Sequence, residues 1–184
     1  MTVHVSYARR PLARRNSFAG LTPLGPDQFE GYASLFGVRD GAGDMVAPGA
    51  FAASLRRRGA GAVRMLYQHF AHSPIGVWET IAEDARGLYV RGRLSTDIEQ
   101  ARDIRALLAD GALNGLSIGF RTVRAARQAG GRMLLQIDLL EISIVTFPLL
   151  AGSQVTAIGG RGEPGKEDLA RAFRDAGALM RAPA

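Results

Sequence analysis

The feature that most constrains the fold is a succession of short apolar or alternating segments between about residue 29 and residue 158. Seven of these segments have the length and two-residue periodicity of β-strands: 29–38, 63–68, 75–81, 88–94, 116–124, 133–147 and 153–158. The segment 133–147 is long for one strand, so we expect a bend or bulge in it. Strands and helices do not alternate, which argues against a doubly wound sheet. The order predicts a mainly β fold, a closed or nearly closed antiparallel barrel of about seven strands with peripheral helices.

Helices and tails are expected around this barrel region, which we place at 28–160. One short helix is predicted at 50–58, and a clearer one ends near Gly111. Thr96 is the candidate N-cap of the clearer helix, where Glu99 would complete a capping box. We interpret 1–27, which contains three prolines, as a flexible basic arm, and 161–184 as a C-terminal helical tail.

Composition narrows the class of protein. A chain of 184 residues accommodates one domain with tails rather than two full domains, and its lack of cysteine excludes a disulfide framework and thiolate chemistry. No run approaches the roughly 18 apolar residues of a membrane span, and the N-terminal segment lacks the apolar core of a secretory signal. We therefore expect a cytoplasmic protein with no membrane contact.

The net charge of +6 raises the question of a nucleic-acid partner. Of the 23 basic residues, only Lys166 is lysine, a skew typical of GC-rich coding bias. Residues 1–26 hold four arginines and no acid, so the rest of the chain contributes only +2. A nearly neutral body with a basic arm disfavours DNA binding, and a nucleic-acid-binding module remains the weaker alternative.

The segment GLSIG at 115–119 matches the nucleophile-elbow pattern G-x-S-x-G. An elbow requires a strand before the serine, a helix after it and a histidine downstream. Here a helix precedes Ser117 and a strand follows it, while His4, His69 and His72 all lie upstream. The α/β-hydrolase interpretation therefore fails, but a serine hydrolase with another chain order remains open.

In such a hydrolase Ser117 needs a base and a group that orients the base. His69 ends an apolar strand, whereas His72 lies in an expected loop. Glu141 lies within the apolar run LLEISIV, where a buried carboxylate needs a partner. Asp138, three residues earlier, would face the opposite side of a regular strand.

Simpler interpretations of each residue carry comparable weight. A serine between glycines is usually a tight strand start, and a strand-end histidine such as His69 is more often structural than catalytic. Glu141 could pair with one of the many arginines. His69-x-x-His72 lacks a clear third ligand, so we expect no metal and no other cofactor.

The motifs carry more information in their order than singly. They are EGYA (30–33), MLYQH (65–69) followed by PIG (74–76), GLYVRG (87–92), GALNGLSIGF (111–120) and LEISIV (140–145) followed by Pro148. This ordered set resembles the prohead (capsid maturation) proteases of tailed bacteriophages. Chain size and the Ala/Arg bias also resemble those of prohead proteases of gene transfer agents.

The resemblance implies a serine endopeptidase that forms an acyl-enzyme, with Ser117 as nucleophile, His69 as general base and Glu141 as third member. It implies that the substrates are the scaffold segment of the major capsid protein and the protease itself, inside proheads assembling in the bacterial cytoplasm. Through the distant similarity of this family to herpesvirus assembly proteases, it also implies a β-barrel and makes a homodimer plausible. A catalytically inactive prohead scaffolding protein is the alternative function.

Two positions depart from the family pattern. Phe70 stands where an acidic or amide residue commonly follows the histidine, a change expected to alter substrate access or histidine orientation. Leu149 and Leu150 replace small and amide residues, a change expected to affect only a turn. The oxyanion donors stay open between main-chain groups near Ser117 and the side chain of Arg121.

Overall fold

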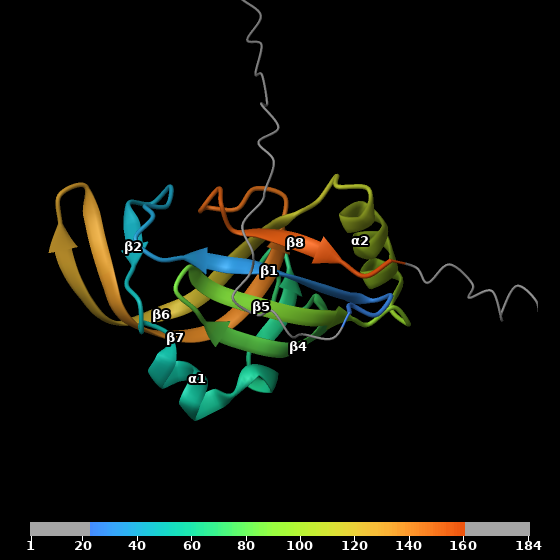
Figure 1. Cartoon of the computed structure of the whole chain (residues 1–184), viewed down its shortest axis with the longest axis horizontal. Coiled ribbons are helices and arrows are strands. Elements are labelled where there is room, and N and C mark those ends of the chain that lie inside the picture. The colour runs from blue at the N-terminus through green and yellow to red at the C-terminus, as the bar shows by residue number, and fades with distance from the viewer. Residues whose placement is uncertain (1–22, 161–184) are drawn as a thin grey trace, which may run out of the picture.

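The computed structural model describes residues 23–160, so most of the predicted arm and the whole predicted C-terminal helix lie outside the described residues. The strands are β1 (Gln28–Leu35), β2 (Asp44–Val46), β3 (Arg64–Tyr67), β4 (Pro74–Glu83), β5 (Gly87–Leu94), β6 (Gly115–Gln128), β7 (Gly131–Val145) and β8 (Gln154–Ile158). The helices are α1 (Ala52–Arg58), the short 3-10 helix η1 (Ala60–Ala62) and α2 (Glu99–Ala109). Figure 1 shows how these strands and helices are arranged in space.

The sheet closes into a barrel, as the strand spacing predicts. Seven strands follow one another in the order β7-β3-β4-β5-β1-β8-β6, and β6 pairs back onto β7, while β2 joins the outer part of β7. The barrel is mixed rather than wholly antiparallel, because β7 runs parallel to both β2 and β3. Short hairpin connections reveal antiparallel neighbours, but these parallel pairs join strands far apart in the chain, so local periodicity does not show them.

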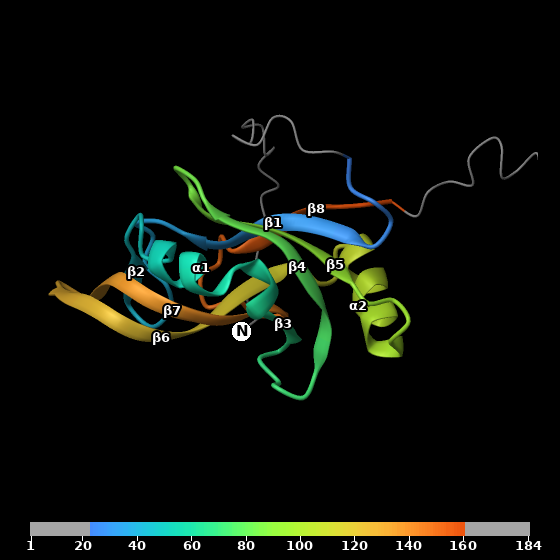
Figure 2. The ribbon, with the colours of Figure 1, turned by 90° about the horizontal axis from the view of Figure 1, so that it is seen from below.

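The two α-helices lie at different places on the barrel (Figures 1 and 2). Helix α1 packs beside β7, and α2 packs near the far ends of β4 and β5. The predicted capping box of α2 is wrong: its N-cap is Ile98, without a side-chain hydrogen bond. The Thr96 hydroxyl instead donates to the Asp27 carboxylate (3.2 Å), so the helix begins later. Gly111, at φ 72°, follows its end as predicted.

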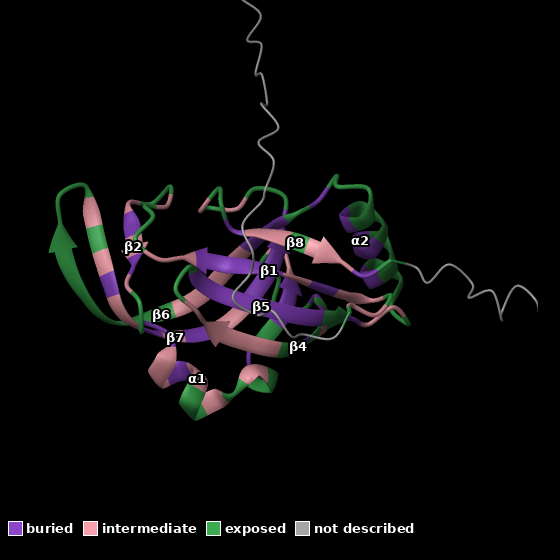
Figure 3. Ribbon diagram, in the orientation of Figure 1, coloured by how far each residue is buried: buried purple, intermediate pink, exposed green. Residues whose placement is uncertain are grey.

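Figure 3 shows that the buried residues concentrate along β1, β5 and the C-terminal end of β7. The outer half of β6, from Arg121 onward, is exposed and projects with β7 as a hairpin beyond the barrel. Within the described part of the chain, no helix combines the length and hydropathy needed to cross a membrane.

Candidate active site

His69 stands on a tight turn that follows β3. The Phe70 N–H donates to the Tyr67 carbonyl (3.0 Å), which closes a four-residue turn. Its two central residues, Gln68 and His69, have φ of 52° and 62°. Two positive φ values are the pattern of a type I′ turn, and they store backbone strain in residues other than glycine. The Gln68 N–H donates to the Ile144 carbonyl of β7 (3.0 Å). The turn is thus fastened to β7 and places His69 beside that strand.

The His69 ring contacts the carboxylate of Glu141. Its Nδ1 lies 2.7 Å from Glu141 Oε1, and the Ser143 hydroxyl donates to Glu141 Oε2, also at 2.7 Å. The same Ser143 oxygen accepts the main-chain N–H of His69 (3.1 Å). An ionised carboxylate can only accept a hydrogen bond, so Nδ1 carries the hydrogen that it donates to Glu141. Nε2 then keeps the lone pair that can take a proton.

A β-bulge in β7 decides which way Glu141 points. Leu139 lies opposite Phe120 and Glu141 opposite Gly119, so Leu140 has no partner on β6. The core-facing residues next to this point are Ile137 and Leu139 before it and Ile142 and Ile144 after it, so the alternation changes from odd to even numbers at Leu140. Without the bulge Glu141 would enter the core, where an unpaired carboxylate is costly. The bend or bulge expected in this long strand is therefore present.

The bulge also changes the expected relation between Asp138 and Glu141. The two carboxylates would lie on opposite faces of a regular strand, but both point away from the core. Asp138 contacts Arg57 and Arg58 of α1, whereas Glu141 contacts His69. The prediction of opposite faces fails because it assumed unbroken alternation.

Gly119 provides the space that the Glu141 carboxylate occupies. A Cβ at Gly119 would overlap Glu141 Oε1 and come within 2.7 Å of its Cδ. The second glycine of the G-x-S-x-G pattern therefore lets a carboxylate from the neighbouring strand lie across β6. It does not form the turn of a nucleophile elbow.

Ser117 lies on the same face of the sheet. It is directly opposite Ser143 in the β6–β7 register, a position that separates Cβ atoms by about 5 Å. Among the described residues, no hydrogen bond joins the Ser117 hydroxyl to the His69 ring. Hydrogen bonds between a nucleophile and its base are often long or poorly aligned before substrate binds.

A small pocket opens next to Ser117, between β6, the end of β1 and the loop after β7. Its apolar wall is formed by Val38, Leu116, Ile118, Phe120, Leu149 and Leu150. Ser153 also lines it, and the buried hydroxyl of this residue has no hydrogen-bond partner within residues 23–160. An apolar pocket with a few polar atoms is the usual form of a site that binds a side chain or small ligand.

Residues 22–167 match the family model described as caudovirus prohead serine protease. The chain belongs to this prohead protease family. Similarity to the prohead protease of Enterobacteria phage HK97 reaches 40% identity over 124 residues, which cover 65% of this chain and 55% of that relative. The chain thus matches little more than half the length of this relative.

Solved structures show the same fold. The KSHV protease, solved with a hexapeptide phosphonate inhibitor, superposes with a TM-score of 0.53 at 9% identity, covering 82% of this chain and 76% of that one. The capsid assembly protease of bacteriophage T4 superposes with a TM-score of 0.53 at 14% identity, covering 66% of this chain and 82% of that one. These likenesses support the barrel fold described above for this chain.

The structure brings together two of the three residues singled out from sequence, His69 and Glu141, and places Ser117 on the adjacent strand. It adds Ser143 and Gly119, which the sequence analysis missed. Ser143 has a detectable signal, because it lies two residues after Glu141 and so shares its face of the strand.

Among residues 23–160, no hydrogen bond or ion pair joins His72 to His69, Glu141 or Ser143. The His72 ring stacks on Phe70 with 5.6 Å between centroids. In the part of the chain that is described, no three potential metal ligands gather in one place.

The two departures from the prohead protease pattern have different surroundings. Phe70 is exposed in the turn next to His69, and its effect on substrate access stays a prediction. Leu149 and Leu150 line the pocket beside Ser117. The expectation that these leucines affect only a turn is therefore too narrow.

Proposed function

We propose that this member of the prohead protease family is a serine endopeptidase. Ser117 is the nucleophile, His69 the general base and Glu141 the group that orients His69. His69 Nε2 takes the hydroxyl proton as Ser117 Oγ bonds to the substrate carbonyl carbon. The proton then passes to the leaving amine as the peptide C–N bond breaks, and water hydrolyses the ester.

The observation that carries this proposal is the contact of 2.7 Å between His69 Nδ1 and Glu141, on the face of the sheet that holds Ser117. This contact leaves Nε2 free to act on a hydroxyl. Ser143 holds the second carboxylate oxygen, which limits rotation of Glu141. A fixed carboxylate favours one imidazole tautomer and stabilises the imidazolium that forms during reaction.

A main-chain oxyanion donor fits this site better than Arg121. The Leu116 N–H donates to the Ser153 carbonyl at the edge of β6 that faces away from β7. Along a strand, every second N–H points to the same edge, so the Ile118 N–H faces the same edge of β6 as the Leu116 N–H. Strand β8 pairs with β6 only at Gly115, so it does not pair with β6 at Ile118. Ile118 borders the pocket beside Ser117. Arg121 lies four residues after Ser117 on β6, so its Cα is about 13 Å from that of Ser117 at the usual rise per residue of a strand.

Family membership supports the substrate assignment. We propose that the chain processes the scaffold segment of the major capsid protein, and itself, inside proheads assembling in the bacterial cytoplasm. Formation of a homodimer and origin in a gene transfer agent stay predictions from the resemblance.

The test is to co-express the full chain with the major capsid protein encoded beside it and to follow capsid-protein size by mass spectrometry. Ser117→Ala, His69→Ala and Glu141→Gln are compared with Ser95→Ala, a partly buried serine at the end of β5. We expect Ser117→Ala to abolish processing, because a missing nucleophile typically costs more than about 1,000-fold. Ser95→Ala should process as wild type does.

Processing that survives Ser117→Ala would show that this residue is not the nucleophile. If the wild-type chain does not cleave the capsid protein but still assembles with it, the inactive scaffolding function is favoured instead.

A further inference from the structure

One edge of β7 is bordered by a helix where the sheet has a gap. Strand β2 pairs with β7 up to Leu134, and β3 pairs with it only from Glu141 onward. Between them the Ile137 N–H donates to the Ala50 carbonyl just before α1 (3.1 Å). The Leu139 N–H donates to the hydroxyl of Ser54 in α1 (2.9 Å). A helix side chain thus replaces a strand partner at Leu139, whose backbone is buried and needs an acceptor.

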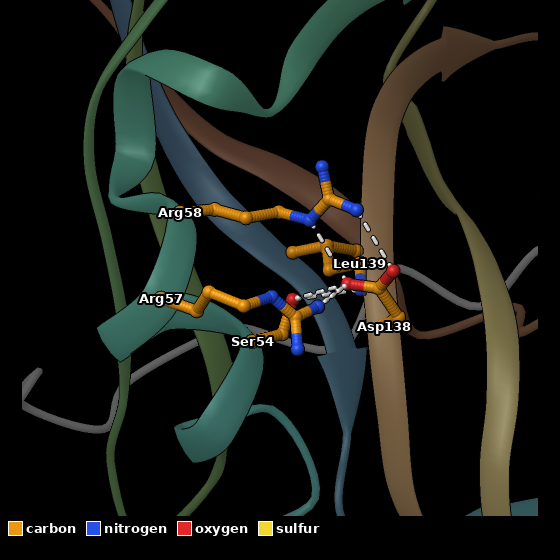
Figure 4. A network of polar contacts seen from close by, with 5 residues as sticks. All are labelled: Ser54, Arg57, Arg58, Asp138 and Leu139. Carbon is orange, nitrogen blue, oxygen red and sulfur yellow. Dashed lines mark hydrogen bonds and ion pairs between the residues drawn. The ribbon is translucent and has the colours of Figure 1, made fainter.

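Ser54 is held in one orientation by the network in Figure 4. Its side chain is 1% exposed, and its hydroxyl donates to Asp138 Oδ1 (3.2 Å). Arg58 donates to both Asp138 oxygens (2.8 and 2.9 Å), and Arg57 donates to Oδ1. With its proton directed to Asp138, the Ser54 oxygen presents a lone pair to the Leu139 N–H.

The position of this hydrogen bond matters because Leu139 is the last core-facing residue before the bulge. Glu141, two residues on, is the first residue after it to lie opposite a β6 partner. We infer that Ser54 is a positioning residue, which fixes β7 at the bulge and so holds Glu141 on the outer face toward His69. The inference rests on the proposed function of Glu141 for its catalytic consequence, but not for the geometry.

Loss of the Ser54 hydroxyl would leave the Leu139 N–H without its acceptor. A buried unpaired donor is costly, so β7 would relax locally to find another partner. A bulge is the part of a strand where such relaxation is easiest, because pairing is already interrupted there. A small shift of Glu141 would lengthen its contact with His69.

The test compares Ser54→Ala with Ser54→Thr, which restores a hydroxyl, and with Val90→Ala, a buried truncation in β5 away from the site. The first readout is the tautomer of His69 in spectra of full-length protein labelled with ¹⁵N-histidine. The chain has three histidines, so the signals can be assigned by substituting each in turn. The second readout is the rate at which a fluorophosphonate labels Ser117.

We expect Ser54→Ala to lose the Nδ1–H preference and to slow labelling by about 10-fold, since small misplacements in a site can cost up to 100-fold. Ser54→Thr should recover labelling to within about threefold, and Val90→Ala should leave the tautomer and rate unchanged while lowering the melting temperature.

A wild-type tautomer in Ser54→Ala would overturn the inference, whatever the labelling rate. If Ser54→Ala alters the His69 tautomer but the wild-type protein shows no labelling that depends on Ser117, the role of Ser54 in positioning Glu141 is supported. The proposed function is then contradicted.

Discussion

At the scale of single residues, the candidate site depends on how one carboxylate is accommodated. The Glu141 side chain is 13% exposed, yet both of its oxygens have partners, His69 and Ser143. Its carboxylate lies over Gly119, where any larger residue would displace it. Hydrogen bonding compensates the desolvation of a mostly buried carboxylate, and the missing side chain at Gly119 supplies its space.

Gly119→Ala should therefore reduce activity much more than stability. The atoms that a new methyl would meet belong to the flexible Glu141 side chain, which can swing away. We expect processing to slow by about 10- to 100-fold while the free energy of unfolding falls by less than about 1 kcal/mol.

Cleavage kinetics and urea unfolding measure these two quantities. Gly61→Ala is the matched control, because nothing lies within 4 Å of a Cβ at that position. Equal activity in the two variants would contradict the role assigned to Gly119.

At the scale of elements, β7 organises the site because it meets more neighbours than any other strand. It pairs with β6 along one side and with β2 and β3 along the other, and α1 borders the gap between them. The Arg58 side chain hydrogen-bonds to Asp138 and is the main cause that lowers the pKa of this carboxyl to about 2. The contact between α1 and β7 is therefore partly ionic.

This ionic contact should make α1 docking sensitive to acid. A carboxyl whose pKa is lower in the folded state contributes stability above its unfolded pKa, near 4, and loses it as the pH falls toward about 2. We expect the stability difference between wild type and Asp138→Asn to be largest above pH 4 and to shrink between about pH 4 and pH 2.

Urea unfolding at stepped pH measures this difference. Asp103→Asn, at an exposed position of α2 outside the ion pairs found among residues 23–160, is the control. A difference for Asp138→Asn that stays constant down to pH 2 would argue against a pH-dependent ionic contact.

At the scale of the whole molecule, the two ends of the described chain lie side by side and are held by α2. The buried Arg105 donates to the carbonyls of Pro26 (2.7 Å) and Gly159 (3.3 Å) and pairs with Asp27 (3.2 Å). The Gly159 N–H donates to the Gln28 carbonyl (2.8 Å). One arginine thus joins the entry to β1, the exit from β8 and a helix.

Arg105→Met keeps the apolar stem but removes every donor, and we expect it to lower the free energy of unfolding by about 2 to 3 kcal/mol. Arg93→Met removes an exposed pair with Glu79 (3.2 Å) and should cost less than about 1 kcal/mol. Urea unfolding of both variants measures the comparison, and equal losses would show that Arg105 does not hold the ends together.

Much of this protein was predictable from sequence because strand periodicity and motif order are local properties. Apolar runs and alternating segments located all the barrel strands, and a lone carboxylate in the apolar run LLEISIV identified Glu141 as unusual. Ser117 and His69 followed from chain order and resemblance. Their catalytic roles stay predictions that the variants above test.

The sequence by itself determined which segments form strands and which residues can carry chemistry, since both depend on neighbours along the chain. Tertiary structure decided the parallel pairing of β7 with β3, the bulge at Leu140 and the parts taken by Gly119, Ser143 and Ser54. The physical reason is that a bulge forms where strands distant in sequence must satisfy each other's hydrogen bonds. A shift of one residue at that point turns Glu141 from the core toward His69.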